Sequence, residues 1–310
     1  MSKRPRWKWL VPGMAAVLTA LSAGTVAGFL AAVNRSSPED VARQYYEAYR
    51  LGNAEVAYRL TSRTFQELVP LQAFQKAVEL DAAVHVQSFT VGPRLESDSN
   101  RVVLELAYAV QGPSGTATVK KQVAVVNTGE GWRVDVPPGG YVSIATELAE
   151  PIASTERNGV SLAVKPIRVR TSILRDGSAR SATDVYVVVT NHSGKTLRFD
   201  LTPHESPGGA QLLHRASGQV YHLVLASIRG PRTQQEVSGQ GGQQFFAEVP
   251  DGGSATLHLQ FEPVVEGATT LALKVGPFSF PGGELWFATI DGIETRVVHY
   301  TDDMRMRPQL

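Results

Sequence analysis

The sequence predicts an N-terminal transmembrane helix, then an α+β domain with three helices on a curved antiparallel sheet, and then an all-β sandwich. Three observations support this prediction. Residues 10–33 form an uncharged and mostly apolar run. Behind that run, apolar residues recur first at helical spacing and then at the alternating spacing of strands. From Gly159 onward, only short strand patterns and turns follow.

The run over residues 10–33 is long enough to cross a membrane. As a helix its 24 residues extend roughly 36 Å, whereas the hydrocarbon core of a bilayer is about 30 Å thick. The basic residues that precede it are Lys3, Arg4, Arg6 and Lys8. Because basic residues mark the cytoplasmic side of a span, we expect a single-pass protein of the cell membrane. Residues 1–9 then form a cytoplasmic basic tail, the helix contacts membrane lipid, and the C-terminus lies outside.

The same run also has features of a signal peptide that is cleaved. Ala20-Leu21-Ser22 fits a cleavage site with small residues after a short apolar core. The run continues to Val33, however, which is further than a signal core requires, and this length favours a retained anchor. Both interpretations remain open.

Small residues recur at every fourth position within the run. They are Ala16, Ala20, Gly24, Gly28 and Ala32. This spacing places them along one stripe of a helix, and small residues let two membrane helices approach closely. The stripe is the hypothetical dimer face of a homodimer formed through the transmembrane helix. The alternative is that glycine and alanine are simply common in membrane helices.

The α+β domain is predicted over residues 37–136. Ser37-Pro38 is typical of a helix start, and Gly52 of a helix end. Asn53 can cap a second helix, and a third is expected near Pro70. Strand patterns then follow over residues 84–95, 101–111, 116–126 and 132–136. Helices followed by a meander predict helices packed on one face of an antiparallel sheet.

Two segments of this domain carry a resemblance to a known superfamily. They read Tyr-Tyr-Glu-Ala-Tyr-Arg-Leu-Gly-Asn-Ala-Glu-Val-Ala-Tyr-Arg-Leu and, at the end, Gly-Trp-Arg-Val-Asp. The domain resembles the NTF2-like domains of bacterial membrane-anchored and penicillin-binding proteins. The resemblance implies a cone-shaped pocket, in which the enzymes of that superfamily hold a carboxylate or an Asp/His pair. Asp81 and His85 are the candidate pair here, and the alternative is a solvated pair at a helix-to-strand junction.

A linker is predicted over residues 137–158, because Pro137-Pro138-Gly139-Gly140 cannot continue a sheet ladder. Whether it holds a short strand or a helical turn stays open. The sandwich is predicted over residues 159–300, with a flexible tail at residues 301–310. Alternation is plain over residues 257–261, where Leu and Phe alternate with His and Gln.

The sandwich carries a second resemblance. Its segments Val-Tyr-Val-Val-Val-Thr-Asn-His-Ser-Gly-Lys-Thr-Leu and Val-Pro-Asp-Gly-Gly-Ser-Ala-Thr-Leu-His-Leu-Gln-Phe-Glu-Pro are similar to immunoglobulin-like, or telokin-like, domains outside the membrane in Gram-positive surface proteins. Such domains usually act as adhesive, spacing or partner-binding modules. The cysteines and the central tryptophan of antibody-type domains are absent, so the resemblance concerns the sandwich alone.

Composition excludes several kinds of chemistry. The chain has no cysteine, which rules out disulfides and thiolate catalysis. The histidines of the sandwich are His192, His204, His214, His222, His258 and His299. None has the spacing of a helical metal motif, so no metal ligand, cofactor or catalytic residue is predicted. The whole chain carries +1 and its first eight residues +4, which leaves about −3 on the rest. No nucleic-acid partner is therefore expected.

Basic residues form two small clusters, Lys120-Lys121 and Arg168 with Arg170. The second pair lies on one strand face, as is ordinary for a solvated side, and the alternative is binding of an anionic wall polymer or headgroup. The sequence as a whole favours a membrane-anchored, extracytoplasmic, non-enzymatic interaction or scaffold protein of the bacterial cell envelope, whose partner is an unidentified envelope protein. The alternative is binding of a small apolar ligand, or catalysis, in the NTF2-like pocket. A buried titratable pair in that pocket would favour the alternative.

Overall fold

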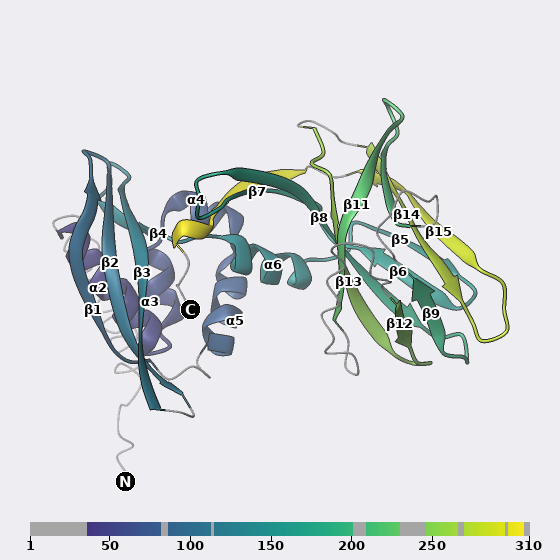
Figure 1. The fold of residues 1–310 in the computed structure, drawn as a ribbon, viewed down its shortest axis with the longest axis horizontal. Helices are drawn as coiled ribbons and strands as arrows, with labels where there is room; N and C mark the ends of the chain where they lie inside the picture. The colour runs from purple at the N-terminus through teal and green to yellow at the C-terminus, as the bar shows by residue number, and fades with distance from the viewer. Residues whose placement is uncertain are drawn as a thin grey trace, which may run out of the picture. The chain divides into compact units, whose positions relative to one another are not determined.

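The computed structural model describes residues 36–81, 86–112, 115–200, 209–229, 246–265, 270–294 and 297–306 (Figure 1). These residues form two compact units. The first contains the described residues before Leu68 together with Val78–Val136, and the second contains Leu68–Ala77 and Pro137–Arg307. The predicted membrane helix at residues 10–33, with its stripe of small residues, lies outside the described residues. Among those described, no helix is both long and apolar enough to span a bilayer.

The helices of the first unit begin and end at the predicted signals. In α2 (Pro38–Arg50), the Ser37 hydroxyl accepts a hydrogen bond from the backbone N–H of Asp40 at 3.2 Å. Gly52, just beyond its end, has a φ of +73°, a conformation that favours glycine. The Asn53 side chain caps α3 (Ala54–Arg59). The short α4 (Arg63–Leu68) and then α5 (Leu71–Asp81) follow, and Leu68–Ala77 of this stretch belongs to the second unit.

A four-stranded antiparallel sheet completes the first unit. Its strands are β1 (Val86–Ser97), β2 (Arg101–Gly112), β3 (Gly115–Asn127) and β4 (Trp132–Asp135), in that spatial order. Helix α2 contacts β1, β3 and β4, and so it crosses the sheet. Val41 and Tyr45 of α2 are buried, as are Leu104 and Leu106 of β2. The apolar face of α2 and the β2 face thus supply the core, as the switch in periodicity predicts.

The second unit is a large antiparallel β region, as predicted. Its strands are β5 (Ala153–Arg157), β6 (Val160–Val164), β7 (Arg168–Ile173), β8 (Ala179–Asn191), β9 (Leu197–Asp200), β10 (Gln211–His214), β11 (Gln219–Arg229), β12 (Phe246–Val249), β13 (Ser254–Phe261), β14 (Thr270–Ser279), β15 (Trp286–Glu294) and β16 (Val298–Asp303). The spatial order is β12-β9-β14-β10-β11-β13-β8-β6-β5, with β15 on β14 and β7 on β8. Leu257, Leu259 and Phe261 are fully buried, which confirms the predicted alternation along β13.

Strand β11 joins the two halves of this region. Its residues 219–222 pair with β10, and its residues from Leu223 onward pair with β13, with a register shift between Leu223 and Leu225. Strand β16 instead pairs in parallel with β7. Strand β11 therefore changes partners along its length, as a strand does where it passes from one sheet to another.

The segments predicted as a linker and as a flexible tail contain regular secondary structure. Residues 137–158, expected to be a linker, contain α6 (Gly139–Leu148) and β5. The helix forms because Val142 and Thr146, four residues apart, are buried on one face. Residues 301–306, expected to belong to a flexible tail, form the end of β16 and the 3₁₀ helix η1 (Met304–Met306). Asp302 is completely buried, which fixes this part of the chain.

Candidate functional site

The acid of the predicted pocket pair is engaged with a neighbouring helix. Asp81 lies at the end of α5, is exposed, and accepts a hydrogen bond from the Tyr49 hydroxyl of α2 at 2.5 Å. His85 lies outside the described residues, so the pairing of the two side chains stays a prediction. The structure therefore shows Asp81 as a contact between α2 and the end of α5.

Lys121 lies on the helix-facing side of the sheet, against two tyrosine rings that sequence reasoning did not connect with it. The Lys121 ammonium is 4.5 Å from the ring centroid of Tyr46 in α2 and 5.8 Å from that of Tyr108 in β2. Lys120 is exposed and pairs with Glu105 at 3.1 Å. Lys120 and Lys121 therefore do not act as one basic cluster, because successive strand residues point to opposite faces. Period-two alternation along β3 was the signal that could have separated them.

The tyrosines around Lys121 keep their protons at neutral pH. Burial raises the pKa of the Tyr46 phenol. Burial also raises the pKa of Tyr108, with smaller contributions from the nearby Tyr46 and Asp81, while the positive charge of Lys121 opposes the rise. These aromatic rings therefore present neutral hydroxyls and π faces to the lysine, an arrangement that stabilises a cation.

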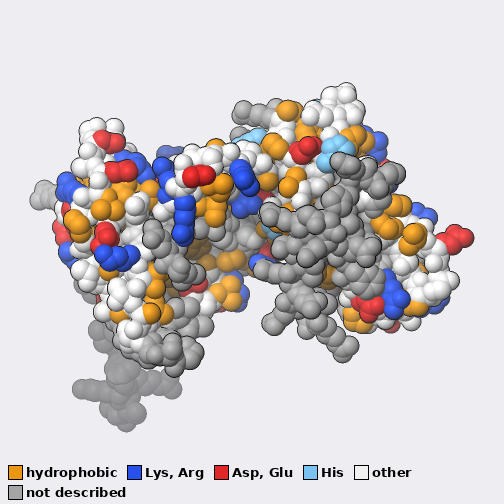
Figure 2. All heavy atoms as spheres, viewed as in Figure 1, with side chains coloured by type: hydrophobic (Ala, Val, Ile, Leu, Met, Phe, Trp, Pro, Cys, Tyr) orange, Lys and Arg blue, Asp and Glu red, His pale blue; other side chains and the backbone are white. Residues whose placement is uncertain are grey.

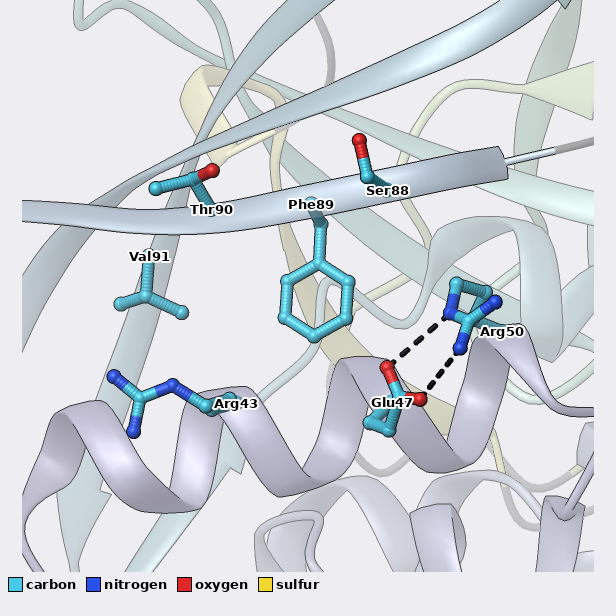
Figure 3. A pocket seen from close by; sticks show the side chains of 7 residues that line it. All are labelled: Arg43, Glu47, Arg50, Ser88, Phe89, Thr90 and Val91. Atoms are coloured by element: carbon cyan, nitrogen blue, oxygen red, sulfur yellow. Dashed lines mark hydrogen bonds and ion pairs between the residues drawn. The ribbon is translucent and has the colours of Figure 1, made fainter.

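A groove of about 410 Å³ lies beside this cluster, between α2 and β1. Figure 3 shows that Phe89 and Val91 point toward α2, whereas Ser88 and Thr90 point away from it. Across the groove, α2 contributes three charged side chains, Arg43, Glu47 and Arg50. The Phe89 ring centroid is 6.2 Å from that of Tyr46, so Phe89 forms the boundary between the groove and the tyrosine–lysine cluster.

The charged side chains of the groove differ in how firmly they are held. Arg50 Nη2 lies 2.5 Å from Glu47 Oε1, and Arg50 Nε also donates to Glu47. This hydrogen bonding lowers the pKa of the Glu47 carboxyl. Arg43 instead pairs with Asp40 at 2.9 Å, and both of these side chains are about half exposed. Figure 2 shows acidic and basic side chains interspersed on the visible face of the described residues.

The second unit contains a polar cluster that the sequence did not reveal. Asp184 of β8 is only 4% exposed. His258 Nε2 of β13 lies 2.9 Å from Asp184 Oδ1, and Arg170 Nε of β7 lies 3.2 Å from Asp184 Oδ2. The prediction that Arg168 and Arg170 are solvated is wrong, because Arg170 contacts a buried carboxylate and burial lowers the pKa of Arg168. Arg170 and His258 thus converge on one buried acid.

The histidine of this cluster also stacks on a tyrosine. The rings of His258 and Tyr186 are parallel within 4°, with centroids 4.4 Å apart. The Tyr186 hydroxyl hydrogen bonds with the Ser143 hydroxyl of α6 at 2.8 Å, and burial raises the pKa of Tyr186 to about 12. The cluster therefore connects α6 with strands β7, β8 and β13. Within the part of the chain that the structure describes, no three His, Asp or Glu side chains are grouped to hold a metal ion.

No model of a known protein family matches the chain, and no curated protein matches it. Among solved structures, the chain is similar to a SEC-C motif containing protein from Psychrobacter arcticus, with 16% identity, a TM-score of 0.30 and 34% of this chain covered. The chain spans 62% of the length of that protein. The architecture is an α+β unit with a small antiparallel sheet, followed by a large antiparallel β region.

Proposed function

We propose that this chain is a membrane-anchored, extracytoplasmic interaction or scaffold protein of the bacterial cell envelope, without a catalytic role. One observation carries the proposal. The acids best placed for chemistry are committed to contacts that hold separate elements together: Asp184 with Arg170 and His258, and Asp81 with Tyr49. The partner is an envelope protein.

The geometry of the polar cluster supports a structural role. A general base must reach the proton that it removes, but Asp184 is nearly inaccessible, and its two oxygens contact Arg170 and His258. Ser143 is hydrogen bonded to Tyr186, and His258 directs Nε2 to Asp184. Removing one partner of such a buried carboxylate destabilises a fold strongly, so the cluster stabilises the fold best when all its members are present.

We further propose NTF2-like and immunoglobulin-like folds for the two units. Helices packed across an antiparallel sheet support the first proposal, and β11, which changes partners along its length, supports the second. The apolar run at residues 10–33 supports membrane anchoring. Only residues 34–37 separate that run from α2, so an anchored protein would hold its first unit close to the membrane surface.

Site-specific photo-crosslinking in intact cells tests this function. A photoreactive residue replaces exposed Thr118 in the first unit or exposed Gln219 in the second, within the full chain. We expect a discrete crosslinked envelope protein from at least one unit. If a series of exposed positions across both units yields no protein adduct, the interaction function is wrong.

A second candidate function is binding of a small apolar ligand in the groove between α2 and β1. Its volume of about 410 Å³ lies within the range of roughly 300–1,000 Å³ typical of ligand pockets, and Phe89 and Val91 give it an apolar wall. Native mass spectrometry of the purified full chain tests this candidate. A bound small molecule that disappears in Phe89→Ala would favour it over the interaction function.

A further inference from the structure

We propose that the groove between α2 and β1 binds an extended, acidic peptide segment of a protein partner, which pairs with the open edge of β1. This inference rests on the proposed interaction function and specifies the chemistry of the partner. Its basis is the combination of three features. Among the described residues, one edge of β1 has no partner strand and Arg43 is held only by an exposed ion pair, and the groove also has an apolar wall.

The groove follows the backbone edge of a strand. Strand β1 lies at the end of its sheet and, within the described residues, pairs only with β2. Four consecutive residues, Ser88–Val91, line the groove, although their side chains alternate between the two faces (Figure 3). A space that touches all four must run along the edge, where alternate residues present unpaired N–H and C=O groups. An added strand can use those groups.

The available edge is short. The register of β1 against β2 shifts between Val91 and Arg94, where Pro93 also lacks a backbone donor. It shifts again between Arg94 and Glu96. Arg94 is further tied to Glu39 at 2.5 Å. Pairing is thus confined to about four residues, or roughly 13 Å of strand. This length suits a short extended segment of a partner.

The walls of the groove indicate which side chains the segment carries. Phe89 and Val91 are half-buried and point toward α2, so they favour apolar side chains at alternate positions of the peptide. Arg43 has a side chain 59% exposed and pairs with Asp40, which is 48% exposed. Such surface pairs are weak, so a carboxylate of the peptide can replace Asp40. Arg50 is instead held by two contacts to Glu47.

A second copy of the chain fits this edge poorly. Figure 3 shows Phe89 above Glu47, with Arg43 and Arg50 on either side. An antiparallel pairing of two β1 strands about a two-fold axis near Phe89 would bring Glu47 toward its own copy and Arg43 toward Arg50. Like charges facing one another across an interface disfavour the pairing. A peptide with carboxylates meets no such repulsion from Arg43.

Fluorescence anisotropy with the full chain in detergent tests the proposal. The probe is a labelled peptide Glu-Thr-Val-Thr-Val-Thr-Glu, which presents a glutamate to Arg43 in either strand direction. Its twin has Lys in place of both Glu residues. We expect the acidic peptide to bind wild type more tightly, and Arg43→Glu to weaken it by about three- to tenfold and to favour the lysine twin. The control Arg63→Glu, at a side chain 88% exposed on α4, should change neither affinity.

Backbone methylation separates strand pairing from simple charge attraction. Two further versions of the acidic peptide carry N-methyl groups on either alternate set of backbone nitrogens, and at least one should fail to bind. Amide exchange at Ser88–Val91 should slow when the unmodified peptide binds. Equal binding of all versions of the peptide would overturn the proposal. So would the finding that the groove is occupied by a second copy of the chain or by a small molecule and does not bind the peptide. If the peptide fails while crosslinks from Thr118 or Gln219 persist, this inference falls and the interaction function stands.

Discussion

Removal of the Asp184 carboxylate should destabilise the second unit more than removal of an exposed carboxylate. In Asp184→Ala, Arg170 and His258 lose the buried acid that both contact. Breaking a fully buried ion pair costs about 3–5 kcal/mol. The side chains of Arg170 and His258 are 24% and 25% exposed. Water can therefore solvate both side chains in part after the carboxylate is removed, which reduces the loss of stability. We expect a loss of about 2–4 kcal/mol in the free energy of unfolding.

Hydrogen exchange in increasing urea measures this loss for the second unit alone, through the amides of β8 and β13. The matched control is Asp291→Ala, which removes the partner of Arg215 from a pair whose side chains are 46% and 60% exposed. That change should cost less than about 1 kcal/mol. Asp184→Asn, which keeps an acceptor but loses the charge, should fall between the two. Equal losses for Asp184→Ala and Asp291→Ala would refute a stabilising role of the cluster.

Two further predictions concern the second unit. Gly159 has a φ of +73°, and a Cβ there would lie 2.9 Å from Ser193 Cα. Gly177 has a φ of +82°, but a Cβ there would meet open space. In urea unfolding, Gly159→Ala should therefore lower the free energy of unfolding by about 2–4 kcal/mol and Gly177→Ala by about 1 kcal/mol. Comparable losses would contradict the steric argument. Burial raises the pKa of Tyr186 to about 12 from its unperturbed 10.0. The contribution of this raised pKa to the free energy of unfolding is therefore complete below pH 10 and is lost as the pH rises toward 12. Tyr186→Phe, which also loses the bond to Ser143, should show a shallower fall in stability over that pH window; an unchanged slope would show that Tyr186 is not responsible.

The helices of the first unit could be predicted because their signals are local. The cap at Ser37, the left-handed Gly52 and the cap at Asn53 lie within a few residues of the helix ends they define. The sequence left a short strand and a helical turn both open where α6 lies, because Pro137-Pro138-Gly139-Gly140 is typical of a break. The helix is held by contacts from distant strands, such as Ser143 with Tyr186, and tertiary contacts can override weak propensity.

The polar cluster lay beyond sequence reasoning for the same reason. Asp184, Arg170 and His258 lie on three strands, and only the register of β8 with β7 and β13 brings them together. The parallel pairing of β16 with β7 likewise joins strands from opposite ends of the second unit. Alternation along β3 could have separated Lys120 from Lys121, since it requires only the period of a strand. The local pattern thus predicts which side chains share one face of a strand. Pairing between distant strands decides which of those side chains come into contact.

The location of both units outside the membrane is the claim on which the proposed function depends most directly. Because the chain has no cysteine, single cysteines can be introduced at exposed Ser99 in the first unit and exposed Glu284 in the second, with Ser2→Cys as the cytoplasmic control. The measurement is labelling of spheroplasts with a membrane-impermeant maleimide. We predict that Ser99→Cys and Glu284→Cys are labelled before lysis and that Ser2→Cys is labelled only after it. Labelling of Ser99→Cys and Glu284→Cys only after lysis would contradict the account.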